Sequence, residues 1–214
     1  MISLSVPLIL LVLTAGISIY AWSNPDLLDK WTMNPYRMQR KGEWYRFITS
    51  GFLHADWMHL IFNMLAFYSF GNAVYAQFQV NLGETPGLLL FLLLYLGGIV
   101  VSDIPTYFRH RNDPDYRSLG ASGGVAAVLF SGILFNPVGG EGEGIIIFPI
   151  PIPIKPFIFG FLYLGYSYYM GRRRGDNINH DAHFYGALYG IILTLIALPE
   201  IIPGFVVQIR DFVF

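Results

Sequence analysis

Apolar residues are concentrated in six long windows of the chain that contain no Asp, Glu, Lys or Arg. The windows cover residues 1–25, 57–83, 85–102, 118–140, 156–171 and 182–199. A helix needs about 20 mainly apolar residues to cross the hydrocarbon layer, with about 17 as a lower working limit, so the fifth window is marginal and the others suffice. The pattern predicts six membrane-spanning helices, at about residues 3–22, 57–76, 87–107, 120–135, 157–170 and 181–198.

Composition agrees with this pattern. Of the 214 residues, 54% are hydrophobic and 13% are charged, whereas a soluble domain is typically about a quarter charged. The mean hydropathy is +0.50. Because the six segments use nearly the whole chain, we expect residues 1–214 to form a single all-α transmembrane domain. The first segment has no basic start and its uncharged run is longer than a signal-peptide core, which indicates a retained span.

Three further segments differ from the spans in composition. Residues 23–56 are rich in Trp, Tyr, Pro and charge, and amphipathic aromatic residues favour the membrane interface. Residues 138–155 combine glycines with alternating isoleucine and proline. Repeated proline excludes a regular helix, so we expect an extended interfacial loop there. Residues 201–214 are too short to span again and are predicted to lie in the interface.

Charge and cysteine usage exclude several classes of function. The net charge is −1 and the basic residues form short loop clusters, so nucleic acid is not an expected partner. The chain has no cysteine, which excludes disulfides, thiol catalysis and cysteine-ligated metal sites. Two histidine pairs, His54 with His59 and His180 with His183, lack an Asp or Glu at the spacing of a metalloprotease. We therefore expect no catalytic metal and no cofactor.

Polar side chains recur at the amino-terminal ends of the second, fourth and sixth predicted spans. The second carries His59 and Asn63, which are four residues apart and share a helical face. The fourth carries Ser122, and the sixth carries His180 and His183. Even-numbered helices of a serial bundle start from the same side, so the three clusters should converge at one depth. A hydroxyl, an imidazole and further donors can supply the nucleophile, the base and the oxyanion stabilisers of acyl transfer.

Glycines flank Ser122 in the sequence Gly-Ala-Ser-Gly-Gly at residues 120–124. They allow a sharp turn and a close approach of a substrate carbonyl, and the Ser122 amide at a helix start would be free to bind an oxyanion. Simpler interpretations exist, because an intramembrane serine often bonds its own helix and a lone histidine is often a packing residue. For Gly186 and Gly190 we keep the interpretation that they permit close helix contact.

Taken together, these motifs resemble those of the rhomboid intramembrane serine proteases, over about residues 43–190. Residues 120–123 resemble the family's Gly-x-Ser-Gly motif, which implies that Ser122 is the nucleophile. Residues 182–190 resemble its Ala-His-x-x-Gly-x-x-x-Gly span, which implies that His183 is the base. Several ordered motifs are far more specific than Gly-x-Ser-Gly alone. The supporting glycines of the two motifs are Gly120, Gly123, Gly186 and Gly190.

Two earlier segments carry the rest of the resemblance. His59 and Asn63 match a His-x-x-x-Asn element, which implies that their side chains line the oxyanion site together with the Ser122 amide. His54 resembles a further family histidine that is considered structural. Residues 43–46, Glu-Trp-Tyr-Arg, resemble the first-loop Glu-x-Trp-Arg element and end at Arg46, although a tyrosine replaces the usual tryptophan.

The resemblance implies a six-helix rhomboid-like bundle with an interfacial first loop. It implies an intramembrane serine endopeptidase that cleaves transmembrane substrate proteins in the lipid bilayer, and with no Asp evident as a third member we expect a Ser-His dyad. Ser122 Oγ should then lie roughly 2.6 to 3.5 Å from a His183 ring nitrogen. The fifth span, with Gly160 and Gly165, is a candidate moving gate. We expect a multi-pass protein of the bacterial inner membrane.

Two features depart from the family pattern. The family commonly has an aromatic residue one turn after the nucleophile, which supports the histidine ring, whereas this chain has Ala126. The second departure concerns orientation. Eleven of the thirteen Lys and Arg residues follow the first, third and fifth spans, so the positive-inside rule predicts active-site loops in the cytoplasm. The family implies an active site that faces the extracytoplasmic side, and we follow the family.

Two other functions are open. One is a catalytically inactive rhomboid-like protein that binds membrane clients, although the presence of both Ser122 and His183 argues against it. The other is a small transporter, which would be expected to have carboxylates near the midplane of the bilayer. The carboxylates of this chain lie largely in loops, and Asp103 is near the end of a span.

Overall fold

Helices make up most of the computed structural model, which describes residues 5–140, 142–147, 150–173, 176 and 178–214. Two short strands, β1 (Ile145–Ile147) and β2 (Ile150–Ile154), lie between α7 and α8. Apart from this hairpin, the predicted all-α fold is confirmed. The helices are α1 Val6–Trp22, α2 Pro25–Trp31, α3 Pro35–Lys41, α4 Arg46–Thr49, the 3₁₀ helix η1 Ser50–Phe52, α5 Trp57–Leu82, α6 Glu84–His110, α7 Ser122–Phe135, α8 Pro156–Arg173, α9 His180–Ala197 and α10 Ile201–Val213.

Each predicted span overlaps one helix, in the order α1, α5, α6, α7, α8 and α9, and residues 3–4 of the first span lie outside the described part of the chain. Within the described residues, α6 alone is long and apolar enough by itself to cross a membrane. Helices α9 and α10 meet that test as a pair bent by 117°. Helices α1 and α7 have 17 and 14 residues and are too short for it. The count of six spans therefore stays a prediction.

Side-chain caps determine where several helices begin. The side chains of Asn24 and Asn34 each accept a hydrogen bond from the amide three residues later, and a proline follows each cap at the first helical position. Proline fits there because it lacks a backbone N–H, and an N–H at the first helical position would have no acceptor within the helix. Asp56 caps α5 in the same way, by accepting from the His59 amide at 2.8 Å. The polar connection after α1 thus folds into short helices.

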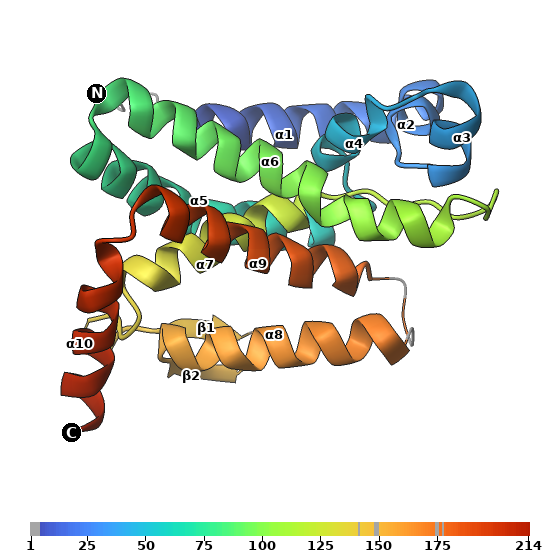
Figure 1. Cartoon of the computed structure of the whole chain (residues 1–214). Coiled ribbons are helices and arrows are strands. Elements are labelled where there is room, and N and C mark those ends of the chain that lie inside the picture. The colour runs from blue at the N-terminus through green and yellow to red at the C-terminus, as the bar shows by residue number, and fades with distance from the viewer. Residues whose placement is uncertain (1–4, 141, 148–149, 174–175, 177) are drawn as a thin grey trace.

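Helix α7 occupies the centre of the bundle, where it packs against α5, α6 and α9 (Figure 1). Ten of its residues, from Gly123 to Ile133, are buried, which explains why its sequence is apolar on all sides. Helix α8 lies on the outside and packs mainly against α9. The main core includes Phe67, Phe78, Phe91, Leu94, Tyr95, Ala127 and Val128.

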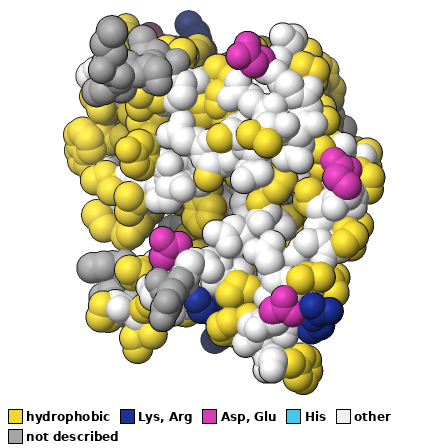
Figure 2. Space-filling model, turned by 90° about the vertical axis from the view of Figure 1, so that its left-hand side faces the viewer, with side chains coloured by type: hydrophobic (Ala, Val, Ile, Leu, Met, Phe, Trp, Pro, Cys, Tyr) yellow, Lys and Arg dark blue, Asp and Glu magenta, His cyan; other side chains and the backbone are white. Residues whose placement is uncertain are grey.

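The two ends of the bundle differ in chemistry. Helices α5, α7 and α9 run in the same direction and start from the end where α2, α3 and α4 lie, at the right of Figure 1. Figure 2 faces the opposite end, where no histidine side chain is visible among the coloured residues. The expectation that the starts of the second, fourth and sixth spans lie on one side agrees with this arrangement.

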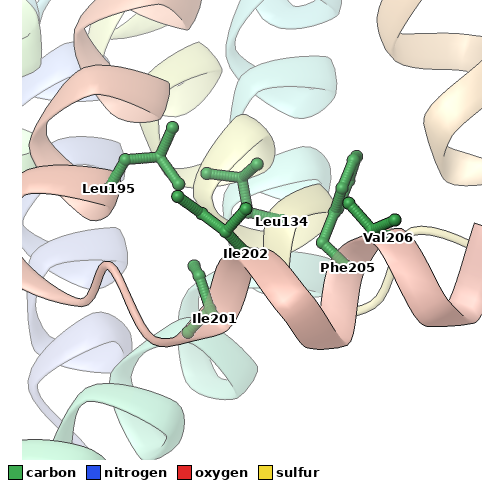
Figure 3. A pocket seen from close by; sticks show the side chains of 6 residues that line it. All are labelled: Leu134, Leu195, Ile201, Ile202, Phe205 and Val206. Carbon is green, nitrogen blue, oxygen red and sulfur yellow. The ribbon is translucent and has the colours of Figure 1, made fainter.

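The hairpin and α10 belong to the end opposite the starts of α5, α7 and α9. Strands β1 and β2 pair antiparallel, with Ile145 opposite Ile154, so the predicted extended loop is a hairpin; residues 141, 148 and 149 lie outside the described part. Helix α10 folds back from α9 after Pro199, with Leu198 outside the helical region as expected before proline. A wholly apolar pocket lies where α10 meets α7 and α9 (Figure 3), and it is lined by Leu134, Leu195, Ile201, Ile202, Phe205 and Val206.

Candidate active site

Ser122 is the first residue of α7 and is partly exposed. Its backbone amide occupies the first helical position, where no intrahelical acceptor exists, so the amide remains able to bind an anion. Gly120, two residues before Ser122, has a φ of 132°, a conformation that residues with a side chain rarely adopt. A side chain at Gly120 would also be blocked, because an added Cβ would lie 2.8 Å from the ring of His59. The glycine of the motif is therefore needed for both conformation and space.

His183 lies in the first turn of α9, which contacts α7 through glycine. A Cβ added at Gly186 would lie 2.3 Å from the carbonyl oxygen of Gly123, and one added at Gly190 would lie 2.3 Å from that of Ala127. The two backbones can approach this closely only because these positions lack side chains. Since Gly123 follows Ser122 and Gly186 is one turn after His183, the contact brings the hydroxyl and the imidazole to the same end of one helix interface.

No hydrogen bond joins Ser122 Oγ to the His183 ring within the described residues. The predicted distance of roughly 2.6 to 3.5 Å between these groups stays a prediction. The ring of His59 lies beside the backbone at Gly120, two residues before Ser122. His59 on α5, Ser122 on α7 and His183 on α9, all predicted from the sequence, thus lie in one region of the structure.

The tautomer of His59 follows from its hydrogen bonds. Its Nδ1 accepts from the backbone amide of Ala55 at 3.4 Å, so the neutral ring carries its proton on Nε2. That Nε2 is the atom nearest to Gly120, together with Cε1. His59 can therefore donate a hydrogen bond into the space beside Ser122. Asn63 is buried one turn further along α5, and its amide nitrogen donates to the His59 carbonyl at 3.0 Å.

His54 supports the ring of His59 from the loop before α5. The two rings meet edge to face, with centroids 4.9 Å apart. Ser18 Oγ donates to the Phe52 carbonyl at 2.8 Å and also lies 2.8 Å from His54 Nδ1, so the histidine nitrogen acts as donor in the second bond. Trp22 donates to the His54 carbonyl at 2.8 Å. Helix α1 thus fixes His54, and His54 contacts His59, the candidate donor to the oxyanion.

Asn179, which sequence analysis did not select, joins three parts of the site. Its Oδ1 caps α9 by accepting from the Ala182 amide at 3.1 Å and also accepts from Thr106 at 3.2 Å. Its Nδ2 donates to Asp103 on α6 at 3.3 Å and to Ser118 at 3.2 Å. The side chain therefore ties the start of the His183 helix to α6 and to the segment before Ser122. An Asn before an acidic first turn is a helix-start signal that could have identified it.

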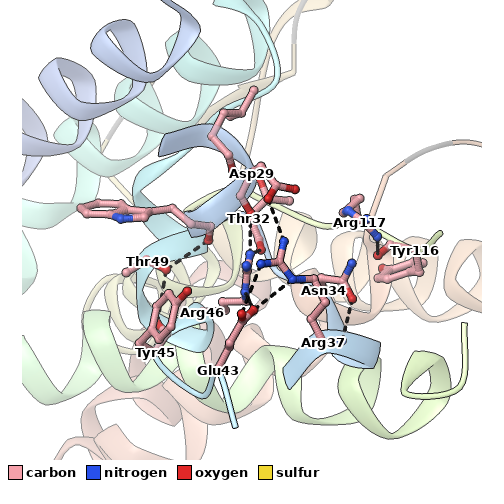
Figure 4. A network of polar contacts seen from close by, with 12 residues as sticks. Asp29, Thr32, Asn34, Arg37, Glu43, Tyr45, Arg46, Thr49, Tyr116 and Arg117 are labelled. Atoms are coloured by element: carbon pink, nitrogen blue, oxygen red, sulfur yellow. Dashed lines mark hydrogen bonds and ion pairs between the residues drawn. The ribbon is translucent and has the colours of Figure 1, made fainter. Parts of the chain in front are cut away.

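The first loop is held together by Arg46, whose side chain is fully buried (Figure 4). Its Nε donates to Glu43 at 2.7 Å, and its Nη1 donates to the Asp29 and Thr32 carbonyls at 2.6 Å each. Arg37 pairs with both Asp29 and Glu43. Burial raises the pKa of Glu43, but the two guanidinium groups lower it more, so the net shift is downward. The hydrogen bond from Arg37 lowers the pKa of Asp29.

This loop also holds the segment that leads to the nucleophile. Met33 and Ser118 form an antiparallel bridge, with amide-to-carbonyl distances of 2.9 and 3.1 Å. The Gly120 amide donates to the Ser50 carbonyl at 3.0 Å. Arg46 bonds the carbonyl of Thr32, the residue before Met33. Its contacts are therefore one residue away from the bridge to Ser118, in the segment that precedes Ser122.

The remaining histidines show no ligand set for a metal. Among the described residues, no group of three or more His, Cys, Asp or Glu side chains could hold a metal ion. His180 is almost fully buried, and its Nε2 contacts the carboxylate of Asp176 at 3.1 Å. The ring of His110 stacks on Tyr116 in the loop after α6.

Comparison with known proteins points to one family. The model of the rhomboid domain matches residues 41–200. The chain is 29% identical over 164 residues to "Putative rhomboid protease YdcA" of Bacillus subtilis (strain 168), covering 74% of this chain and 70% of that protein. It is 29% identical over 161 residues to the chloroplastic Rhomboid-like protein 11 of Arabidopsis thaliana, covering 71% of this chain and 51% of that one.

A further relative is Rhomboid protease GluP of Bacillus subtilis (strain 168), 35% identical over 89 residues. That match covers 42% of this chain and 15% of the relative. The chain therefore spans about half the length of the plant relative and a small part of GluP, and the activities of those whole proteins do not transfer with the match alone.

Proposed function

This chain belongs to the rhomboid family, and from that premise we propose that it is an intramembrane serine endopeptidase that cleaves transmembrane proteins with Ser122 and His183. The observation that carries the proposal is the glycine contact between α7 and α9, which brings the two side chains to one end of the same interface. The nearby His59 ring adds a donor to this region.

The proposed chemistry has two steps that use the same base. Ser122 Oγ attacks a backbone carbonyl of the substrate while His183 accepts the hydroxyl proton and passes it to the leaving amine. Water then hydrolyses the acyl-enzyme, again with His183 as base. His59 Nε2–H, the Asn63 amide and the Ser122 N–H stabilise the oxyanion in both steps. The loss of one such donor typically costs about 10²- to 10³-fold in rate.

Family membership makes the chain an integral membrane protein. We propose that α1, α5, α6, α7, α8 and α9 are six spans of one domain, with α2 to α4 at the interface. The irregular backbone of the first loop is compatible with a bilayer when it is buried in protein or faces water. We further propose the bacterial inner membrane as the location, since one relative comes from Bacillus subtilis, although an Arabidopsis relative is chloroplastic.

The function is tested by comparing the wild type with Ser122→Ala in proteoliposomes that contain a generic transmembrane substrate. We expect cleavage by the wild type and none above background by Ser122→Ala, because the variant has no nucleophile. A fluorophosphonate should label the wild type and not the variant. If both proteins bind the substrate equally and neither cleaves or is labelled, the chain is instead an inactive client-binding member of the family.

The orientation is tested through the absence of cysteine from the native chain. We propose that the active site faces the extracytoplasmic side, as in the family, against the positive-inside count. Arg173 is the last residue of α8 and is exposed, at the same end of the bundle as the candidate active site. An impermeant maleimide should therefore label an Arg173→Cys variant in intact cells. Labelling that appears only after lysis would place the site in the cytoplasm.

A further inference from the structure

The His183 ring has an aromatic neighbour that its own helix does not supply. The ring of Tyr163, on α8, lies against it with centroids 6.0 Å apart and planes inclined by 27°. This spacing is within the 4.5 to 7 Å range of favourable ring pairs, and the small angle corresponds to offset stacking. The ring of His180 also contacts the His183 ring, edge to face, with centroids 5.7 Å apart. Two aromatic contacts therefore limit the rotation of the imidazole.

Tyr163 is itself held in place by other rings. Phe130 on α7 lies 5.5 Å from it, and Phe159, one turn earlier on α8, lies 5.6 Å from it. The ring packs against a buried cluster that includes Ala126, which is one turn after Ser122 and only 3% exposed. Where the family has an aromatic residue on α7, this chain has the small Ala126, and the aromatic ring that packs against this cluster comes from α8.

We propose that Tyr163 is a positioning residue for the base, so that His183 is oriented for proton transfer only while α8 is packed against α9. The proposal rests on the assignment of His183 as base. It makes α8 part of the catalytic machinery and not only a wall of the site. A shift of about 1 Å in a catalytic group can cost about 10²-fold in rate, so losing the stack should affect turnover more than substrate binding.

The ring and not the hydroxyl carries this role. Among the described residues, the Tyr163 hydroxyl makes no hydrogen bond. Tyr163→Phe should therefore keep the stack, whereas Tyr163→Leu removes it while retaining an apolar side chain. Tyr169→Leu is a matched control, because Tyr169 is 57% exposed on the same helix and its ring contacts Arg173 instead.

The test uses the full chain in proteoliposomes with a transmembrane substrate. We expect Tyr163→Leu to lower kcat by about tenfold to 10²-fold and to change KM by less than about twofold, since an interaction used only in the transition state affects kcat. Tyr163→Phe and Tyr169→Leu should stay within about twofold of the wild type for both constants. Equal kcat for Tyr163→Leu and the wild type would overturn the proposal, as would equal losses for Tyr163→Leu and Tyr163→Phe.

A second measurement does not depend on activity. The chain has five histidines, so NMR of ring-labelled histidine in micelles can assign each ring by single substitution. Tyr163→Leu should move the His183 resonance by loss of the ring current, and Tyr163→Phe should leave it nearly unchanged. If the wild type proves inactive but the resonance responds in this way, the orienting contact stands and the proposed function fails. An unchanged His183 resonance in Tyr163→Leu would overturn the contact whatever the activity.

Discussion

His183→Ala should abolish both substrate cleavage and fluorophosphonate labelling of Ser122, with a loss of about 10³- to 10⁴-fold, the upper range for a general base. The reason is that an unactivated hydroxyl is a poor nucleophile. Labelling is followed by in-gel fluorescence over time, and cleavage by the appearance of product fragments. Circular dichroism of the variant should match the wild type, because His183 is partly exposed and makes no hydrogen bond through its ring within the described residues.

His180→Ala is the matched control, since the two histidines are three residues apart and share a face. Their environments differ. His180 is 3% exposed and its Nε2 already contacts Asp176, so that nitrogen is occupied away from Ser122. We expect the rate of fluorophosphonate labelling of Ser122 in His180→Ala to stay within about tenfold of the wild-type rate. The loss would come from the packing that His180 provides beside the His183 ring. If His180→Ala abolished labelling while His183→Ala retained it, the base would be misassigned and the serine mechanism would survive.

Arg46→Met should cause the largest loss of stability, about 3 to 5 kcal/mol, the usual cost of breaking a buried charged pair by removing one partner. Methionine keeps much of the volume but leaves the Asp29 and Thr32 carbonyls without the Arg46 donor, and it leaves the Glu43 carboxylate with Arg37 alone. Unfolding in mixed micelles, followed by circular dichroism, measures the change. Labelling of Ser122 should also slow, because this loop bonds the segment before the nucleophile.

Arg210→Met provides the control for this prediction. Arg210 pairs with Asp211, and both side chains are more than half exposed. Exposed pairs contribute about 0 to 1 kcal/mol, so the same substitution there should change the free energy of unfolding little. Similar losses for the two variants would show that Arg46 contributes no more than a surface charge.

Acid pH should weaken the same loop. The folded-state pKa values of Glu43 and Asp29 are lowered, so their stabilising contribution is present above the ordinary carboxyl pKa and is lost as the pH falls through the lowered values. The wild type should therefore lose stability as the pH decreases below about 4. Arg46→Met should lose less over the same range.

Much of the architecture could be predicted because it depends on local sequence. Apolar runs, prolines and glycines located α1, α6, α7, α8 and α9 to within a few residues, whereas α5 continues well beyond its predicted end, to Leu82. The short helices α2, α3 and α4 and the terminal helix α10 were expected only as interfacial segments and not as helices. The alternation of helix direction also predicted that the polar clusters at the starts of α5, α7 and α9 lie at one end. The spacing of the motifs identified the family, which the domain match over residues 41–200 confirms.

The sequence by itself determined the six apolar helices, the family and the candidate side chains, since hydropathy and motif spacing are properties of neighbouring residues. Only the tertiary structure decided what holds those side chains. Asn179 bonds Ser118 and Asp103, which are 61 and 76 residues away, and Tyr163 reaches His183 from another helix. Such contacts depend on the distance and rotation of packed helices, which are set by the burial of whole faces and by glycine contacts such as that of Gly186. No local pattern in the chain specifies that geometry.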